Sequence, residues 1–301
     1  MRLNPILKRE LRVQGRGYGL LGLFCAVNIL LFLCGILGSL AVVSRMRRDF
    51  EADYGAMLYI YALLKLIMFL MILIISPSLT AGSISGERSL KTLDLLLTTR
   101  MTPFSIILGK QASAFCMTGI LIVSAIPALT VPLMYGGAGP LDVAVTLLSF
   151  LISAFMLLSM GIFAGSFEKS MQKSTALAYG MLLILLAGTV IPGVLTAPFY
   201  EESMNDPFTL LLLFNPLVTE AAVVTAPLSG SQLIGSVYER LGFSLGNLSD
   251  VYIPLALFME LMMGAIFMLL AVRNITPAGL LRRSEGRVTG GEKSRESQNG
   301  K

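Results

Sequence analysis

Between two long apolar segments, residues 82–110 read GSISGERSLKTLDLLLTTRMTPFSIILGK and carry charges where their neighbours carry almost none. Ser85 is a favourable N-cap residue, and Glu87 would then lie in the first turn of a helix, near the positive end of its dipole. On such a helix the charged and apolar side chains separate onto two faces. The polar face would hold Glu87, Lys91, Asp94 and Thr98, and the apolar face Leu90, Leu93 and Leu97 with Leu96 beside them. We therefore expect a short amphipathic helix at a membrane surface between two spans.

Thr102 and Pro103 predict the end of this helix and the start of the next one, because proline fits the first turn of a helix and interrupts its interior. Within the amphipathic helix, Glu87 stands four residues before Lys91, which is the favourable order for a helical ion pair. The other interpretation is an ordinary interfacial helix that binds no partner.

The composition of the chain indicates a polytopic membrane protein. Its 301 residues are 55% apolar and 14% charged, with a mean hydropathy of +0.78, whereas a soluble domain has about 25% charged residues. Cys25, Cys34 and Cys116 all lie in apolar runs, so neither a disulfide framework nor a metal site is expected. The chain has no histidine, the commonest metal ligand and general base. We expect no metal, no cofactor and no catalysis in this chain.

Hydropathy predicts an all-α fold with six transmembrane helices, since about 20 apolar residues cross about 30 Å of hydrocarbon. The spans are expected at about 18–43, 56–81, 104–134, 142–165, 175–199 and 251–272. Pro127 and Pro132 should kink the third span near its outer end. Residues 1–272 would form a single transmembrane domain, and the polar residues 273–301 a disordered tail. In the fourth span, Gly161 and Gly165 form a G-x-x-x-G pattern that suits close helix packing.

Lysine and arginine residues predict the orientation of the spans. Most of them fall in segments that face the same side if both termini are cytoplasmic: the N-terminal residues 1–17, the loop of residues 82–110, the loop with Lys169 and Lys173, and the C-terminal tail. Residues 1–17 also combine basic side chains with leucines one turn apart, which predicts an interfacial helix. A disordered basic tail is the alternative for this segment.

Residues 208–226 are nearly long enough to form a seventh span, which would place the basic tail outside. Asn215 and Pro216 interrupt the segment in its middle, and Glu220 would lie at membrane depth. We expect a re-entrant or outer helical hairpin between spans five and six, buried against other helices rather than lipid.

Two further charges lie inside predicted spans. Lys65 is about ten residues into the second span and Glu260 about ten into the sixth, and both spans start from the outside, so both lie on the order of 14 Å deep. Charges at this depth usually face a partner or a wet cavity. The sequence predicts an intramembrane polar pair of Lys65 and Glu260, with independent snorkelling of Lys65 and a hydrogen-bonded Glu260 as the alternative.

Residues 82–110 also carry a resemblance to a known family. The run GER, followed by TLDLLLTT and closing on ILGK, resembles the first cytoplasmic loop of type 2 ABC exporter permeases. In that family the loop is a coupling helix that docks on a separate ATP-binding subunit. Ser89 stands where relatives usually have a second glutamate, and Arg100 where they often have proline, which affects the details of the contact.

The resemblance implies a non-catalytic permease subunit that exports substrate across the plasma membrane of a bacterium. Two copies, or one copy with a related permease, would bind two ATPase subunits that hold the ATP and Mg²⁺; membrane lipids are expected partners and nucleic acid is not. The implied docking residues are Glu87, Arg88, Leu90, Lys91, Leu93, Asp94 and Leu97, and the implied external gate is the hairpin with Asn215, Pro216 and Glu220. The alternatives are a secondary transporter or channel without an ATPase partner and, on weaker grounds, a membrane-embedded enzyme.

Overall fold

The computed structural model describes residues 9–10, 18–49, 54–91, 102–133, 139–196, 209–225 and 249–276. These residues form helices and no strands. Among them, six helical segments are long and apolar enough to cross a membrane, which confirms the predicted number of spans. The spans are α2 (Tyr18–Asp49), α3 (Tyr54–Ser89), α5 (Pro103–Ser124) continued by α6 (Ile126–Leu133), α7 (Pro140–Phe167), α8 (Met171–Thr196) and α12 (Ser249–Ile275).

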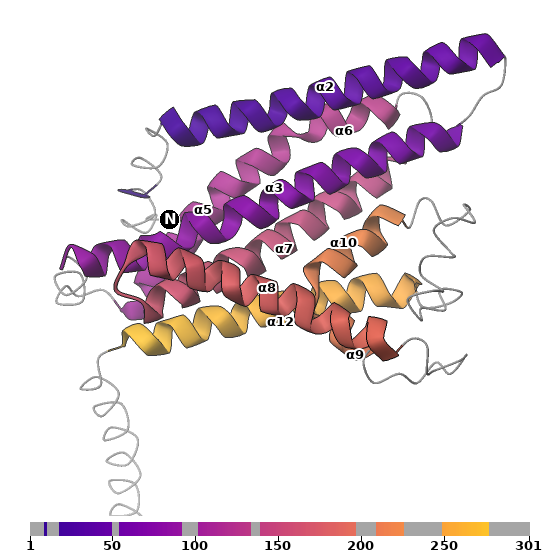
Figure 1. Ribbon diagram of the computed structural model, residues 1–301. Coiled ribbons are helices and arrows are strands. Elements are labelled where there is room, and N and C mark those ends of the chain that lie inside the picture. The colour runs from indigo at the N-terminus through magenta and orange to yellow at the C-terminus, as the bar shows by residue number, and fades with distance from the viewer. Residues whose placement is uncertain are drawn as a thin grey trace, which may run out of the picture.

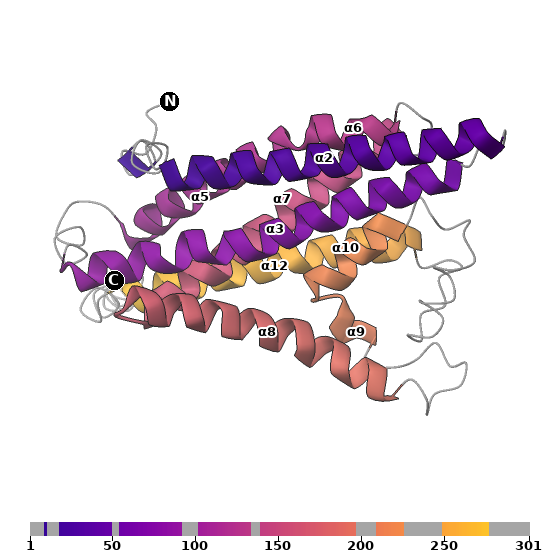
Figure 2. The ribbon, with the colours of Figure 1, turned by 45° about the horizontal axis from the view of Figure 1, so that its top comes forward.

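The long helices run alternately up and down in one elongated bundle (Figures 1 and 2). Helix α7 is the most buried of the six spans and lies between α3 and α12, with which it makes its most extensive contacts. Helices α2 and α8 lie on the outside of the bundle and expose leucines, as suits lipid or another apolar partner. We call the end at which α3, α7 and α12 finish and α5 begins the Lys110 end of the bundle.

Glycine residues bring α7 against α3. The backbone at Gly161 and Gly165 approaches Ala81 and the carbonyl of Pro77 so closely that a Cβ atom would not fit. Thr80 fixes the same contact, because its hydroxyl donates to the carbonyl of Leu158 at 2.9 Å. The G-x-x-x-G pattern thus marks a helix contact, as its spacing suggested.

Helix α3 departs from the prediction at its C-terminal end. It does not stop at residue 81 but continues to Ser89, so Ser85 is a buried mid-helix residue and not the N-cap of a new helix. Its hydroxyl donates to the carbonyl of Ala81 at 3.0 Å, and that of Ser83 to Thr80 at 2.7 Å. These local bonds satisfy the hydroxyls inside the helix. Two residues after the end of the helix, Lys91 has a left-handed φ of 56°.

The third span begins and breaks where the sequence indicated. Thr102 caps α5 by accepting a hydrogen bond from the amide of Ser105, and Pro103 occupies the first turn. The break lies at Ala125, two residues before Pro127, because the proline has no N–H to continue the helical ladder. The kink predicted for this span is therefore present.

The segment before α12 forms two short helices, α9 (Thr209–Leu212) and α10 (Pro216–Thr225), which meet at Asn215. Helix α10 packs against α3, α7 and α12 at the end of the bundle opposite Lys110 (Figure 1). The break at Asn215 and Pro216 agrees with the prediction. The re-entrant path of the hairpin and the interfacial helix of residues 1–17 stay predictions, and of the latter only residues 9 and 10 are described.

Candidate functional site

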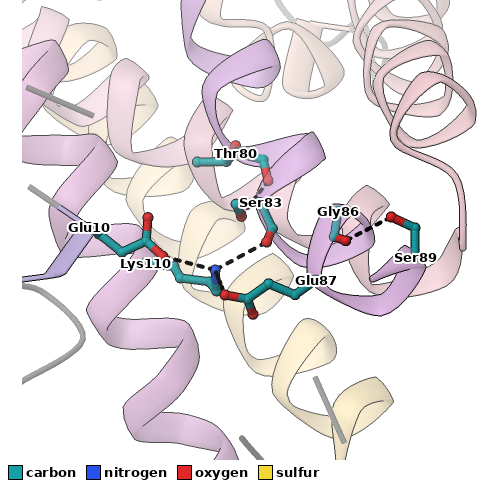
Figure 3. A network of polar contacts seen from close by, with 7 residues as sticks. All are labelled: Glu10, Thr80, Ser83, Gly86, Glu87, Ser89 and Lys110. Carbon is teal, nitrogen blue, oxygen red and sulfur yellow. Dashed lines mark hydrogen bonds and ion pairs between the residues drawn. The ribbon is translucent and has the colours of Figure 1, made fainter. Parts of the chain in front are cut away.

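A buried lysine links the C-terminal end of α3 to α5, the helices that precede and follow residues 92–101. Lys110 lies two turns into α5, is 4% exposed and points toward the last turns of α3 (Figure 3). Its Nζ lies 3.0 Å from Glu87 Oε1 and 3.2 Å from Glu10 Oε1, and it donates to the carbonyl of Ser83 at 3.1 Å. We call Glu10, Glu87 and Lys110 the Lys110 node.

The ammonium group of Lys110 has a full set of hydrogen-bond acceptors. A lysine ammonium has three protons, and three acceptors surround it here. Both glutamates are largely buried, with 17% and 15% of their side chains exposed, and Lys110 is the basic side chain that lies between them. Glu87 also lies in the last turn of α3, close to the negative end of the helix dipole, which Lys110 offsets. The position of Glu87 thus depends on Lys110.

This geometry corrects the expected arrangement of the loop. Glu87 was expected in the first turn of a helix with Lys91 one turn on, but α3 ends between the two residues. Arg88 lies in the last turn of α3 and donates to the carbonyl of Phe167, at the end of α7, at 3.4 Å. Leu90 is 74% exposed, whereas Leu93, Asp94 and Leu97 lie outside the described residues.

Lys65 and Glu260, which were expected to form an intramembrane pair, have different partners in the structure. Lys65 is fully buried; its Nζ donates to the carbonyl of Val223 at 3.3 Å and lies 4.4 Å from the centre of the Tyr61 ring. Glu260 is also fully buried but accepts a hydrogen bond from Ser153 at 2.6 Å. No Lys65–Glu260 ion pair is present in the described part of the chain. The Lys65 side chain is directed toward α10, whereas the Glu260 side chain is directed toward α7.

Glu220 of α10 completes a buried cluster that we call the carboxyl cluster: Glu220, Glu260, Ser149 and Ser153. Ser149 Oγ lies 3.1 Å from Glu220 Oε2, and Ser153 Oγ lies 3.4 Å from Glu220 Oε1. Ser153 therefore contacts both glutamates. Lys65 lies near enough to Glu220 for their charges to interact. The cluster joins α7, α10 and α12 and lies next to α3. In the described ranges no three acidic, cysteine or histidine side chains gather as a metal site would need.

A match to a family model identifies the family of the chain. The model described as ABC-2 family transporter protein covers residues 44–273, which include both the carboxyl cluster and two of the three residues of the Lys110 node. The chain belongs to the ABC-2 transporter family. A comparison with curated proteins gave no match. As an ABC-2 transporter it is a multi-pass membrane transport component, of a kind that works in general with an ABC ATPase.

In this ABC-2 transporter, Asn215 organises the hairpin of α9 and α10. Its Oδ1 accepts hydrogen bonds from the amides of Leu217, at 2.9 Å, and Val218, which caps α10, and Pro216 occupies the first helical position. Its Nδ2 donates to Thr189 Oγ1 of α8 at 2.7 Å. Asn215 therefore ties the start of α10 to α8.

Replacing Asn215 with alanine should loosen α10. Loss of an N-cap side chain typically costs about 0.5–2 kcal/mol, and here the bonds to α8 are lost as well. We expect faster hydrogen exchange of the α10 amides and a lower melting temperature. Thr189→Val removes only one of the two hydrogen bonds from Asn215 to α8, since the bond to the carbonyl of Leu186 at 3.1 Å stays, and it should have the smaller effect. Unchanged exchange in Asn215→Ala would show that the cap is not needed.

The spacing of polar residues along α7 could have indicated the carboxyl cluster from the sequence, whereas the depth of single charges in the membrane did not. Thr146, Ser149 and Ser153 stand at i, i+3 and i+7 and thus lie on one face of an otherwise apolar span. Polar side chains on one face of a span need partners inside the bundle. In the structure, Ser149 and Ser153 find these partners in Glu220 and Glu260.

Proposed function

We propose that this chain is the transmembrane permease subunit of an exporter driven by ATP that a separate ATPase subunit hydrolyses. Membership of the ABC-2 family supports a transport function. The single observation that carries the finer proposal is the Lys110 node, because it joins both ends of the segment expected to dock on the ATPase. A docking segment needs such a rigid base to move the spans.

The proposed mechanism needs no chemistry from this chain. The ATPase subunits bind ATP and Mg²⁺ and close, and residues 92–101 move with them. Because Lys110 fixes the end of α3 to α5 and to Glu10, the movement reaches two spans and the N-terminal segment together. Two copies of the chain, or one copy with a related permease, then change access to a path between them. Both termini would lie in the cytoplasm and the spans in the plasma membrane.

Leu90 offers a direct test of docking. It is 74% exposed at the end of α3, where an ATPase groove would cover it. Burial of one leucine is worth about 1.5–3 kcal/mol, so Leu90→Asp should weaken ATPase binding by roughly 10- to 150-fold. Leu93→Asp should act in the same direction if Leu93 shares the groove. Affinity is measured by pull-down and titration of the ATPase against the permease in nanodiscs.

Leu141 provides a matched control for this test. It is also an exposed leucine, 75% exposed, but lies at the start of α7 on the opposite end of the bundle. Leu141→Asp should leave ATPase binding unchanged. Retention of full ATPase affinity by both Leu90→Asp and Leu93→Asp would contradict the docking proposal.

The carboxyl cluster is the observation that favours a second candidate, a secondary transporter without an ATPase. Such proteins commonly place acidic residues at membrane depth. The two functions differ in their energy source. Transport that requires hydrolysable ATP and a bound ATPase supports the permease, and transport by the chain alone along an ion gradient supports the second candidate.

A further inference from the structure

Two buried carboxyl groups face the same hydroxyl at the carboxyl cluster. Ser153 Oγ lies 2.6 Å from Glu260 Oε2 and 3.4 Å from Glu220 Oε1. The glutamate oxygens therefore lie within about 6 Å of each other, a range in which one negative charge disfavours the other. Glu220 is 2% exposed and Glu260 is fully buried, so water screens this repulsion little.

The surrounding charges balance only one of the two carboxylates. In the described part of the chain, Lys65 from α3 and Glu260 from α12 lie close enough to Glu220 for their charges to interact, and Lys65 is in turn near Tyr61 of α3 and Asp142 of α7. Lys65 is the cation among them, and Asp142 adds a further acid whose Oδ2 accepts from the amide of Gly139 at 2.7 Å. If Glu220 and Glu260 were both ionised, an excess negative charge would lie in an apolar interior, which is strongly unfavourable.

The hydroxyl groups also supply too few protons for two ionised carboxylates. A serine hydroxyl donates one hydrogen bond. Ser149 has two acceptors in reach, the carbonyl of Thr146 at 2.9 Å and Glu220 Oε2 at 3.1 Å, and Ser153 has one on each glutamate. If Glu220 carries a proton, it becomes a donor to one of the serine oxygens. Ser149 is then free to donate to Thr146, and Ser153 to Glu260.

Glu260 also lacks a hydrogen-bond donor at one of its two oxygens in the described structure. Its Oε1 accepts no hydrogen bond from the described residues, although it is fully buried. Thr219 lies close to it, but the Thr219 hydroxyl donates to the carbonyl of Asn215 at 3.1 Å. A buried oxygen without a donor costs more on a charged carboxylate than on a neutral carboxylic acid, so a proton shared by the two carboxyl groups would lower this cost.

We propose that Glu220 and Glu260 form a proton-binding site, in which one exchangeable proton holds α10 against α7 and α12. When the proton leaves to water, one O–H bond breaks and both groups become carboxylates. Their repulsion then favours separation of α10, which carries Glu220, from α12, which carries Glu260. A cavity of about 540 Å³, lined by Lys65, Asp142, Val223 and Leu257, adjoins the carboxyl cluster.

Infrared titration of the full chain in nanodiscs, without any ATPase, tests the site. We expect the carbonyl stretch of a buried protonated carboxylic acid at neutral pH. Glu220→Gln and Glu260→Gln should each abolish it, because removal of one carboxyl group lets the other ionise without a second negative charge beside it. Glu168→Gln, the same change at the end of α7, should leave the band intact. Each glutamine preserves the shape of the side chain that it replaces.

Hydrogen exchange supplies a second readout. After correction for intrinsic rates, protection of the α10 amides should fall as the pH rises in the wild type, since the stabilising form is protonated. In Glu260→Gln the protection of the α10 amides should be independent of pH. Absence of the acid band in the wild type, its persistence in both glutamine variants, or its loss when sodium replaces choline at constant pH would overturn the proposal. The last result would assign the site to a monovalent metal cation instead.

Discussion

Replacement of Gly161 by leucine should prevent α7 from packing against α3 and thereby abolish the folded bundle. A Cβ atom at this position would lie 2.8 Å from the carbonyl oxygen of Pro77 and 3.3 Å from the amide nitrogen of Ala81. Both are backbone atoms, which cannot move aside as a flexible side chain can. Overpacking of a core costs about 1–3 kcal/mol and occasionally more. We expect the upper end of that range, because α3 and α7 share the largest interface of the bundle.

The measurement is the yield of monodisperse protein after extraction into detergent, together with its melting temperature. Gly119→Leu is the matched control, since a Cβ at Gly119 meets no atom within 4 Å. Gly165→Leu should resemble Gly161→Leu, because its Cβ would lie 2.6 Å from the carbonyl oxygen of Ala81. A stable, monodisperse Gly161→Leu protein would show that the two helices can separate at no great cost.

The spans and their breaks could be predicted from the sequence because each depends on a local property. A membrane requires a minimum apolar length, which hydropathy measures directly. Pro127 and Pro216 lack an N–H, and each lies beside a break between helices. Pro77, Pro192 and Pro254 lie inside continuous helices, so a proline alone does not predict a break. Thr102 and Asn215 are good N-cap residues beside a proline, and both cap a helix in the structure.

The end of α3 could not be predicted in the same way. Gly82, Ser83, Ser85 and Gly86 are weak helix formers, which made a boundary near residue 82 the natural expectation. Tertiary contacts decide the outcome instead. The carbonyl of Ala81 accepts a hydrogen bond from Ser174 of α8 at 2.5 Å and packs on Gly165, so the helix is held through this region by its neighbours.

The partners of Lys65 and Glu260 could not be predicted from the depth of these residues in the membrane alone. Lys65 and Glu260 lie at similar distances from the ends of their spans, but pairing further requires that both side chains face each other. The rotation of each helix is set by packing, such as the stacking of Phe69 on Phe150. Lys65 is therefore turned toward α10, and Glu260 toward Ser153 of α7.

Replacement of Lys110 by methionine should disconnect the segment of residues 92–101 from the spans. Methionine keeps most of the side-chain volume but removes the cation that lies between Glu10 and Glu87. Removing one partner of a buried ion pair costs about 3–5 kcal/mol, and the value here should lie toward the lower end because both glutamates are partly exposed. We expect a lower melting temperature and, in the complex with its ATPase, ATP hydrolysis that no longer drives transport.

A double-mutant cycle with Glu87→Gln separates this effect from a general loss of packing. Glu87→Gln in the Lys110→Met background removes one of the two opposed charges, so it should restore part of the stability. Residues in contact typically show coupling energies of about 0.5–3 kcal/mol. Lys173→Met, which removes an exposed lysine of α8, should leave both stability and coupled transport unchanged. Additive effects of Lys110→Met and Glu87→Gln would show that the node does not act as a unit. Normal coupled transport by Lys110→Met would show that movement of the docking segment reaches the spans by another route.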